Sequence, residues 1–325
     1  MTTTQEHTAD RRTTSGTAGL VRTLLRLHRT ALWVWTAFVV LTAGLLLWLW
    51  GPGANAAQRA FDAFGYSGAQ ENAFAGRGMF FGSPGAFDSL FYQPSTLISF
   101  ASLAIAVFAA GPLIARELER GTVRVAWTQS VSPARWLAAK LAVPAVLIAV
   151  GTGILVVLYR FVWNAHNHLL VAGIGPRSFY FSLGPATVAN ALFGLAVGVL
   201  AALVLRRTLP ALAVAVVVQF LAGAMRGNNW PFQHSPFSRL QPELPVYGKA
   251  ITSSGARISD PDCNLSQKCL DAHHVTGFTR TYLPSPDYWP RQLAETGVLL
   301  GLTALAVVAA FLVLRRYLPK KGASA

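Results

Sequence analysis

A cluster of charged residues near position 116 marks a segment that could contact another molecule. Four of them end an apolar run, in the order Arg116, Glu117, Glu119 and Arg120, and Gly121 comes next. Helices often end at a glycine, because glycine adopts positive φ at little steric cost. Ser132-Pro133 then restarts a helix, with serine as N-cap and proline at its first position. The pattern predicts an exposed contact element between two helices; the alternative is a solvated connector with charged ends.

Motifs for catalysis and for cofactor binding are absent from the sequence. There is no G-x-x-x-x-G-K-[ST] phosphate loop, no H-E-x-x-H and no G-x-S-x-G. Two histidine pairs, at 166 and 168 and at 273 and 274, lack further Cys, Asp or Glu at ligand spacing. We therefore expect no catalytic residue, no metal site and no cofactor.

The composition predicts that the elements carrying this segment lie in a membrane. Of 325 residues, 53% are hydrophobic and only 12% are charged, whereas soluble proteins carry about 25% charged residues. Disorder needs low hydrophobicity and high charge, and a disulfide framework needs more than the two cysteines present. A polytopic membrane protein remains.

Six apolar stretches are long enough to cross a bilayer, which takes about 20 residues in a helix. They are Ala31–Trp50, Ser95–Ala115, Leu141–Tyr159, Leu183–Leu205, Leu209–Met225 and Thr296–Leu314. None of them carries Asp, Glu, Lys or His in its middle, which disfavours an ion-coupled transporter or an intramembrane enzyme. The predicted fold class is an all-α membrane protein with six transmembrane helices.

The distribution of basic residues predicts the orientation of these spans. One alternating set of flanking segments, which includes both ends of the chain, holds 16 Lys and Arg against four acidic residues. The other set holds 11 against nine and is much longer. Basic residues in short loops stay in the cytoplasm. Both termini are therefore expected to be cytoplasmic, and the basic excess is explained by topology and anionic lipid, without nucleic acid.

The segments between the spans divide the chain further. We expect a disordered cytoplasmic tail at 1–16 and a basic amphipathic helix at 17–30 that lies in the membrane interface; a plain extension of the first span is the alternative. Residues 31–225 hold the first five spans with the cytoplasmic loop 116–140. Residues 226–295 form an extracellular loop, and 296–325 hold the sixth span and a basic cytoplasmic tail.

Two residue pairs predict local contacts. Cys263 and Cys269 lie in the extracellular loop, where thiols oxidise, and are expected to form a disulfide; the alternative is two free thiols. Gly194-x-x-x-Gly198 and Gly297-x-x-x-Gly301 have the spacing that lets membrane helices approach closely.

The segment 116–140 resembles the signature of ABC-2 type permeases, the membrane subunits of type V ABC exporters. The resemblance rests on Glu117-x-x-x-Gly121-Thr122, on Ser130-Val131-Ser132-Pro133-x-Arg135 and on Lys140. The run Glu-Arg-Gly-Thr through Ala-Trp-Thr-Gln-Ser, which includes Trp127, is similar to the version in actinobacterial members. The long loop before the sixth span, which holds both cysteines, departs from the family's pattern.

The resemblance implies a permease that pairs with a separate ATP-binding subunit and with a second permease chain, identical or different, in a bacterial plasma membrane. It implies that 17–30 is the connecting helix and that 116–140 holds the coupling helix. Since the chain lacks a phosphate loop, ATP hydrolysis would belong to the partner. A membrane scaffold or assembly factor without transport is the alternative, and the coupling-like loop discriminates between them, because an anchor does not need it.

Overall fold

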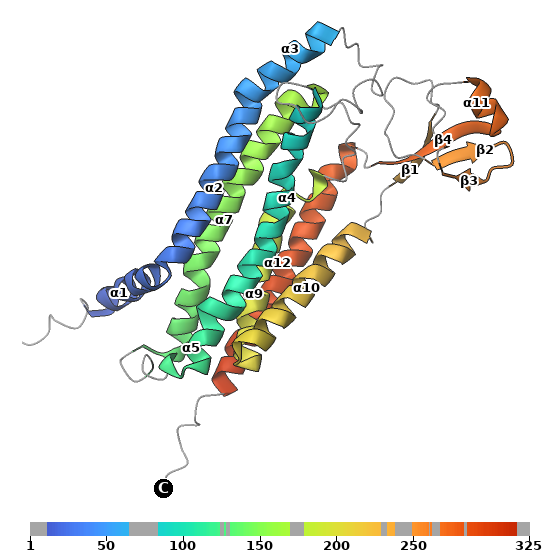
Figure 1. The fold of residues 1–325 in the computed structure, drawn as a ribbon. Coiled ribbons are helices and arrows are strands. Elements are labelled where there is room, and N and C mark those ends of the chain that lie inside the picture. The colour runs from blue at the N-terminus through green and yellow to red at the C-terminus, as the bar shows by residue number, and fades with distance from the viewer. Residues whose placement is uncertain are drawn as a thin grey trace, which may run out of the picture.

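The computed structural model describes residues 12–64, 84–123, 127, 131–169, 179–228, 233–237, 249–259, 261, 267–282 and 285–316. Most of them lie in long, roughly parallel helices, and a small sheet projects from one end of the helical body (Figure 1). Within these ranges, six helices are long and apolar enough to cross a membrane. The six predicted spans are therefore confirmed as helices of that kind.

The first two spans are each built from three consecutive helical segments. The first runs through α2 (Arg29–Trp48), η1 (Leu49–Gly53) and α3 (Ala54–Phe64). The second runs through α4 (Pro84–Phe108), η3 (Ala109–Ala115) and α5 (Arg116–Glu119). Both η segments are π-helical and contain a proline, Pro52 and Pro112. Proline removes one backbone hydrogen bond, and a π turn absorbs that disruption without ending the helix.

The other four spans are single helices. They are α7 (Pro133–His166), α9 (Pro185–Leu205), α10 (Thr208–Asn228) and α12 (Ser285–Arg316), and the short η4 (Asn167–Leu169) follows α7. α12 begins well before the predicted start at Thr296, so the segment between the fifth and sixth spans runs only from 229 to 284. This difference brings polar residues into the helix that the sequence interpretation placed in the loop.

α1 (Arg12–Leu27) is a separate helix that points away from the bundle axis (Figure 1). His28, with φ of −103° and ψ of 22°, separates it from α2. α1 also begins before residue 17, so residues 12–16 belong to a helix and not to the predicted disordered tail; residues 1–11 lie outside the described residues. The side chains of Arg22 and Arg26 are exposed and that of Leu24 is buried.

α9 is the central helix, and it packs against α4, α7, α10 and α12. It approaches the second span at its two glycines: a Cβ at Gly194 would lie 2.7 Å from the carbonyl oxygen of Ser102, and one at Gly198 would overlap the carbonyl oxygen of Ala106. At these two glycines the backbone of α9 therefore lies close to that of the second span. Gly297 and Gly301 have no atom within 4 Å of an added Cβ, so the described part of the chain provides no close helix approach there.

A four-stranded antiparallel sheet lies between α10 and α12 in the sequence, and it was not predicted. Its strands are β1 (Gln233–Phe237), β2 (Lys249–Thr252), β3 (Arg257–Ile258) and β4 (Val275–Tyr282), in the order β1-β4-β2-β3, with α11 (Gln267–Ala272) before β4. Phe278 of β4 pairs with Phe237 of β1 on one side and Ala250 of β2 on the other. The fold is thus all-helical in its spans and carries a small β unit outside them.

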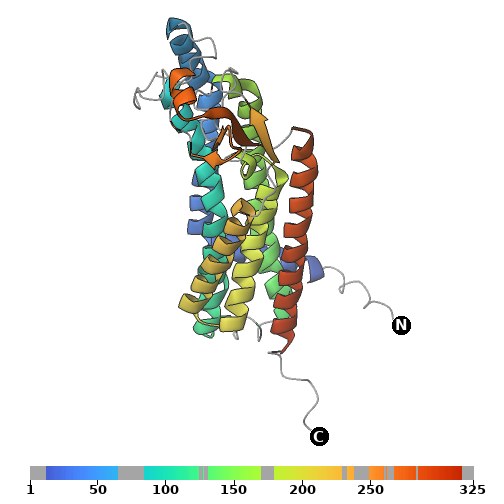
Figure 2. The ribbon, with the colours of Figure 1, turned by 90° about the vertical axis from the view of Figure 1, so that its right-hand side faces the viewer.

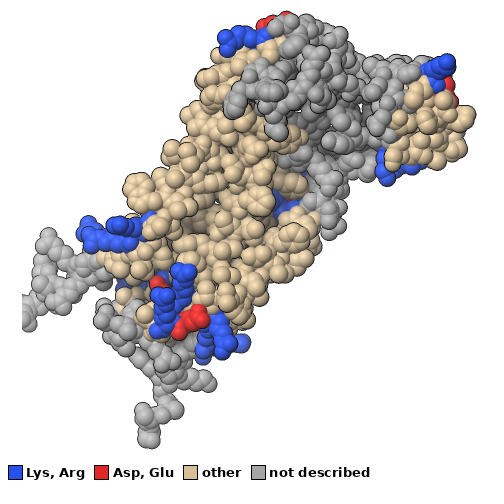
Figure 3. Space-filling view, viewed as in Figure 1, with Lys and Arg blue, Asp and Glu red and all other residues tan. Residues whose placement is uncertain are grey.

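The two ends of the helical body differ. α1, α5 and the C-terminal end of α12 lie at one end, whereas α3 and the sheet lie at the other (Figures 1 and 2). Basic side chains gather at the first end, with the acidic residues of α5 among them, while the flank of the body between the ends is almost free of charge (Figure 3). The described segments of the two predicted loop sets thus lie at opposite ends of the helical body.

Candidate functional site

The candidate site lies where α5 ends and α7 begins, at the basic end of the helical body. Arg120 closes α5, and Gly121 follows with φ of 70° and donates its N–H to the carbonyl of Leu118 at 3.2 Å. Ser132 has extended backbone geometry and accepts a hydrogen bond from the N–H of Arg135 at 3.4 Å, with Pro133 at the first position of α7. The predicted helix end and the predicted N-cap are therefore both confirmed.

Lys140 and Glu117 join the two helices. The ammonium nitrogen of Lys140 lies 2.6 Å from the carboxylate of Glu117 and also 2.6 Å from the carbonyl oxygen of Leu113, to which it donates. Only 1% of the Lys140 side chain is exposed, against 21% for Glu117. A buried charge needs a partner of opposite sign and further hydrogen bonds, and the second span supplies both.

Two tryptophans extend this contact toward the segment after Gly121. The Lys140 ammonium lies 5.3 Å from the centre of the Trp136 ring, and Trp127 packs edge-on against Trp136 at 6.0 Å between ring centroids. The hydroxyl of Thr122 donates to the carbonyl of Glu117 at 3.3 Å. Two further predicted residues of the loop, Thr122 and Trp127, are thus linked to the ion pair.

Glu119 makes a second connection, from α5 to α10. Its carboxylate accepts hydrogen bonds from the N–H of Thr208, at 3.1 Å, and from the hydroxyl of the same residue. Thr208 is the first residue of α10, so the carboxylate satisfies a free N–H group at a helix N-terminus, where negative charge is favoured. The two glutamates of α5 therefore hold two different spans, α7 and α10.

The remaining predicted residues, Arg116, Arg120 and Arg135, are exposed around this contact. His28, at the start of α2, faces the same region. Burial, together with the nearby Lys140 ammonium, lowers the pKa of His28 below its ordinary value. Its imidazole is therefore neutral at physiological pH.

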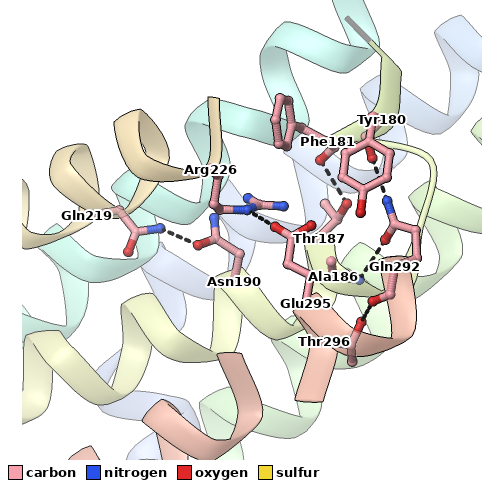
Figure 4. A network of polar contacts seen from close by, with 10 residues as sticks. All are labelled: Tyr180, Phe181, Ala186, Thr187, Asn190, Gln219, Arg226, Gln292, Glu295 and Thr296. Carbon is pink, nitrogen blue, oxygen red and sulfur yellow. Dashed lines mark hydrogen bonds and ion pairs between the residues drawn. The ribbon is translucent and has the colours of Figure 1, made fainter. Parts of the chain in front are cut away.

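A second polar cluster lies near the opposite end, between α9, α10 and α12 (Figure 4). Arg226 of α10 and Glu295 of α12 form an ion pair in which Glu295 is buried. Gln292 of α12 is fully buried; it donates to the carbonyl of Tyr180 at 2.8 Å and accepts from the N–H of Ala186 at 3.3 Å. Gln292 thereby caps the N-terminus of α9.

A glutamine–asparagine pair adds to this cluster. Gln219 of α10 donates to the side-chain oxygen of Asn190 in α9 at 3.2 Å, and both residues are buried. Paired polar groups within membrane helices are restricted to bundle interiors. The cluster was missed because the sequence interpretation began the sixth span at Thr296. The sequence feature that could have revealed the cluster is the pair Gln292 and Glu295, which share a helix face at the i, i+3 spacing.

A family model described as ABC-2 membrane transporter related matches residues 36–227, which is more than half of the chain. The chain belongs to this family. It is therefore a multi-pass membrane protein, and family membership indicates a permease of an ABC transporter that works with an ATP-binding subunit. Permeases of the family are generally non-catalytic membrane components. No curated protein matches the chain.

The matched region of this ABC-2 permease contains every residue of the candidate site from Arg116 to Lys140, while α12 and the β unit lie beyond it. Among the residues that the structure describes, no group of three or more His, Cys, Asp or Glu side chains could hold a metal ion. Cys269 belongs to the described residues, but Cys263 lies outside them. The pairing of the two cysteines therefore stays a prediction.

Proposed function

We propose that this chain is the permease of a type V ABC exporter, and that residues 116–140 transmit the motion of an ATP-binding subunit to the membrane spans. The observation that carries the proposal is the double attachment of α5, through Glu117 to α7 and through Glu119 to α10. A force applied at the end of α5 would reach three spans at once, because both connections are direct contacts between side chains and neighbouring helices.

The positive φ of Gly121 supports the same role. The chain leaves α5 there and enters α7 at Ser132, so the segment is a short crossing between two spans. The exposed guanidinium of Arg135 and the exposed ends of α5 offer a polar surface to a partner. A passive membrane anchor needs no such crossing.

The proposal includes an orientation and an assembly. The basic end would face the cytoplasm, α1 would lie in the membrane interface as the connecting helix, and the β unit would be extracellular. Two permease chains, identical or different, would associate with two ATP-binding subunits. Nucleotide-driven closure of those subunits would shift the pair between two states that open the substrate path alternately, as a population shift between conformations.

The test is co-purification of the full chain with an ABC-type ATP-binding subunit expressed beside it. Arg135→Glu places the opposite charge on the proposed contact surface and should strongly reduce the amount of subunit recovered. Arg316→Glu is the matched control, because Arg316 is also exposed at the same end of the bundle but lies on α12. Equal recovery with both variants, or no subunit recovered with the unchanged chain, would favour a membrane scaffold instead.

A further inference from the structure

A large cavity lies between the first three spans near their basic end. Its volume is about 1100 Å³, slightly above the roughly 300–1,000 Å³ usual for ligand sites. Residues of α2, α4 and α7 line it, together with residues of α1 and α5. The cavity thus touches the proposed connecting helix and both helices of the candidate coupling site.

The wall of the cavity is almost entirely apolar. Large apolar side chains of this wall include Trp35, Phe38, Leu97, Phe100, Phe108 and Leu147, and Phe100 is 64% exposed. A hollow with such a wall on a membrane-embedded flank is suited to hydrocarbon. Lipid tails are as apolar as leucine, so this wall accepts an acyl chain but does not select one lipid over another.

Selectivity comes from the charged end of the cavity. Four charged residues line it: Arg116, Glu117, Arg120 and Lys140. Lys140 and Glu117 neutralise each other, whereas Arg116 and Arg120 are exposed and have no ion pair among the described residues. The apolar hollow therefore ends beside two exposed guanidinium groups that form no ion pair within the described residues.

His28 supplies a further polar group at this place. It lines the cavity, and its Nε2 atom is buried without a hydrogen-bond partner in the described part of the chain. Buried polar atoms normally have a partner. A ligand oxygen or hydroxyl group in the cavity would provide one.

We propose that this cavity binds an anionic phospholipid, with an acyl chain along Trp35 and Phe100 and the phosphate between Arg116 and Arg120. The bound lipid would contact α1, α5 and α7 together and so connect the interface helix to the candidate coupling site. A second copy of this chain is disfavoured as the occupant, because its corresponding end is also strongly basic and would meet like charge.

The proposal goes beyond the proposed function and does not depend on it, since lipid binding is measured on the isolated chain. The full-length protein in a non-ionic detergent is titrated with phosphatidylglycerol or with phosphatidylcholine of the same acyl chains, and bound lipid is counted by native mass spectrometry. Two basic contacts near an anionic headgroup predict about 30-fold tighter binding of phosphatidylglycerol at low salt. The preference should shrink as salt is raised.

Two pairs of variants separate the headgroup from the acyl chain. Arg116→Gln with Arg120→Gln should abolish the preference for phosphatidylglycerol, while Arg315→Gln with Arg316→Gln, on α12, should keep it. Ala104→Trp fills the cavity wall and should reduce binding of both lipids at least tenfold, while Ala304→Trp, an equally exposed position on α12, should not.

Three results would overturn the assignment. The first is equal binding of the two lipids by the unchanged protein. The second is a preference for phosphatidylglycerol that survives the loss of Arg116 and Arg120. The third is an Ala104→Trp variant that binds lipid normally but no longer dimerises. This result would indicate that a second chain, and not a lipid, occupies the cavity.

Discussion

The ammonium nitrogen of Lys140 lies 2.6 Å from the carboxylate of Glu117, and 1% of the Lys140 side chain is exposed. From the sequence alone, Glu117 would pair with its neighbours Arg116 and Arg120 at the water interface, where an ion pair contributes about 0–1 kcal/mol. Instead it compensates a buried charge on another span. The contribution of Glu117 to the structure is therefore larger than its place in the sequence indicates.

Removing one partner of this pair should destabilise the protein more than removing both. Glu117→Gln leaves the Lys140 ammonium buried without compensation, which costs about 3–5 kcal/mol. The double variant Glu117→Gln with Lys140→Met leaves no uncompensated charge and should recover most of that loss. Thermal unfolding of the detergent-purified protein measures both. Strictly additive effects of Glu117→Gln and Lys140→Met would show that the two side chains do not interact.

The two glycine pairs predict opposite responses to the same substitution. Gly198→Ala places a Cβ against the carbonyl oxygen of Ala106 and should lower stability by about 1–3 kcal/mol, as overpacking does. Gly301→Ala has open space around it and should raise stability slightly, by about 0.4–1 kcal/mol. The melting temperatures of the two variants test this. Destabilisation by Gly301→Ala would indicate that another chain packs against α12 at that point.

The orientation of the spans can be measured with reporter fusions. Fusions after Arg207 and after Arg316 should report a cytoplasmic location, and a fusion near Cys269 an external one, because short basic segments stay inside. The structure agrees in placing α5 and the end of α12 together and the β unit opposite (Figure 1). A cytoplasmic signal near Cys269 would rule out the proposed orientation.

Cys263 and Cys269 should be oxidised together in protein taken from cells. A disulfide that closes so short a segment contributes less to stability than one that closes a 15-residue loop, for which about 3 kcal/mol is expected. Reduction should therefore loosen the β unit, where Cys269 packs beside Leu270, and leave the spans folded. Thiol labelling without reductant tests this, and modification of both cysteines would contradict the pairing.

Much of the fold followed from the sequence because the spans are encoded locally. Each apolar run is long enough to cross a bilayer, and Gly121 and Ser132-Pro133 mark helix ends by their own conformational preferences. The candidate loop was also found, because its charges and turn residues are contiguous.

The contacts between distant segments did not follow. In the sequence, Lys140 lies at the basic end of a short predicted helix. Its burial against Glu117 depends on how the second and third spans pack, which the sequence does not show. The start of α12 was misplaced because Gln292 and Glu295 are polar, and their burial depends on Ala186, Tyr180 and Arg226 from other elements. The sheet was missed because its strands are short and paired across long gaps in the sequence.

ATP hydrolysis by the ATP-binding subunit in complex with this chain tests the central claim most directly. Gly121→Val and Gly255→Val are compared with the unchanged chain, because both glycines have positive φ, 70° and 79°, and open space around them. Valine is strained in this conformation, so either substitution distorts its own turn; Gly121 lies in the proposed coupling segment and Gly255 in the β unit. Gly121→Val should lower substrate-stimulated hydrolysis at least tenfold while the complex stays assembled, and Gly255→Val should leave it unchanged. Equal stimulation in all three complexes would contradict the assignment of 116–140 as the coupling element.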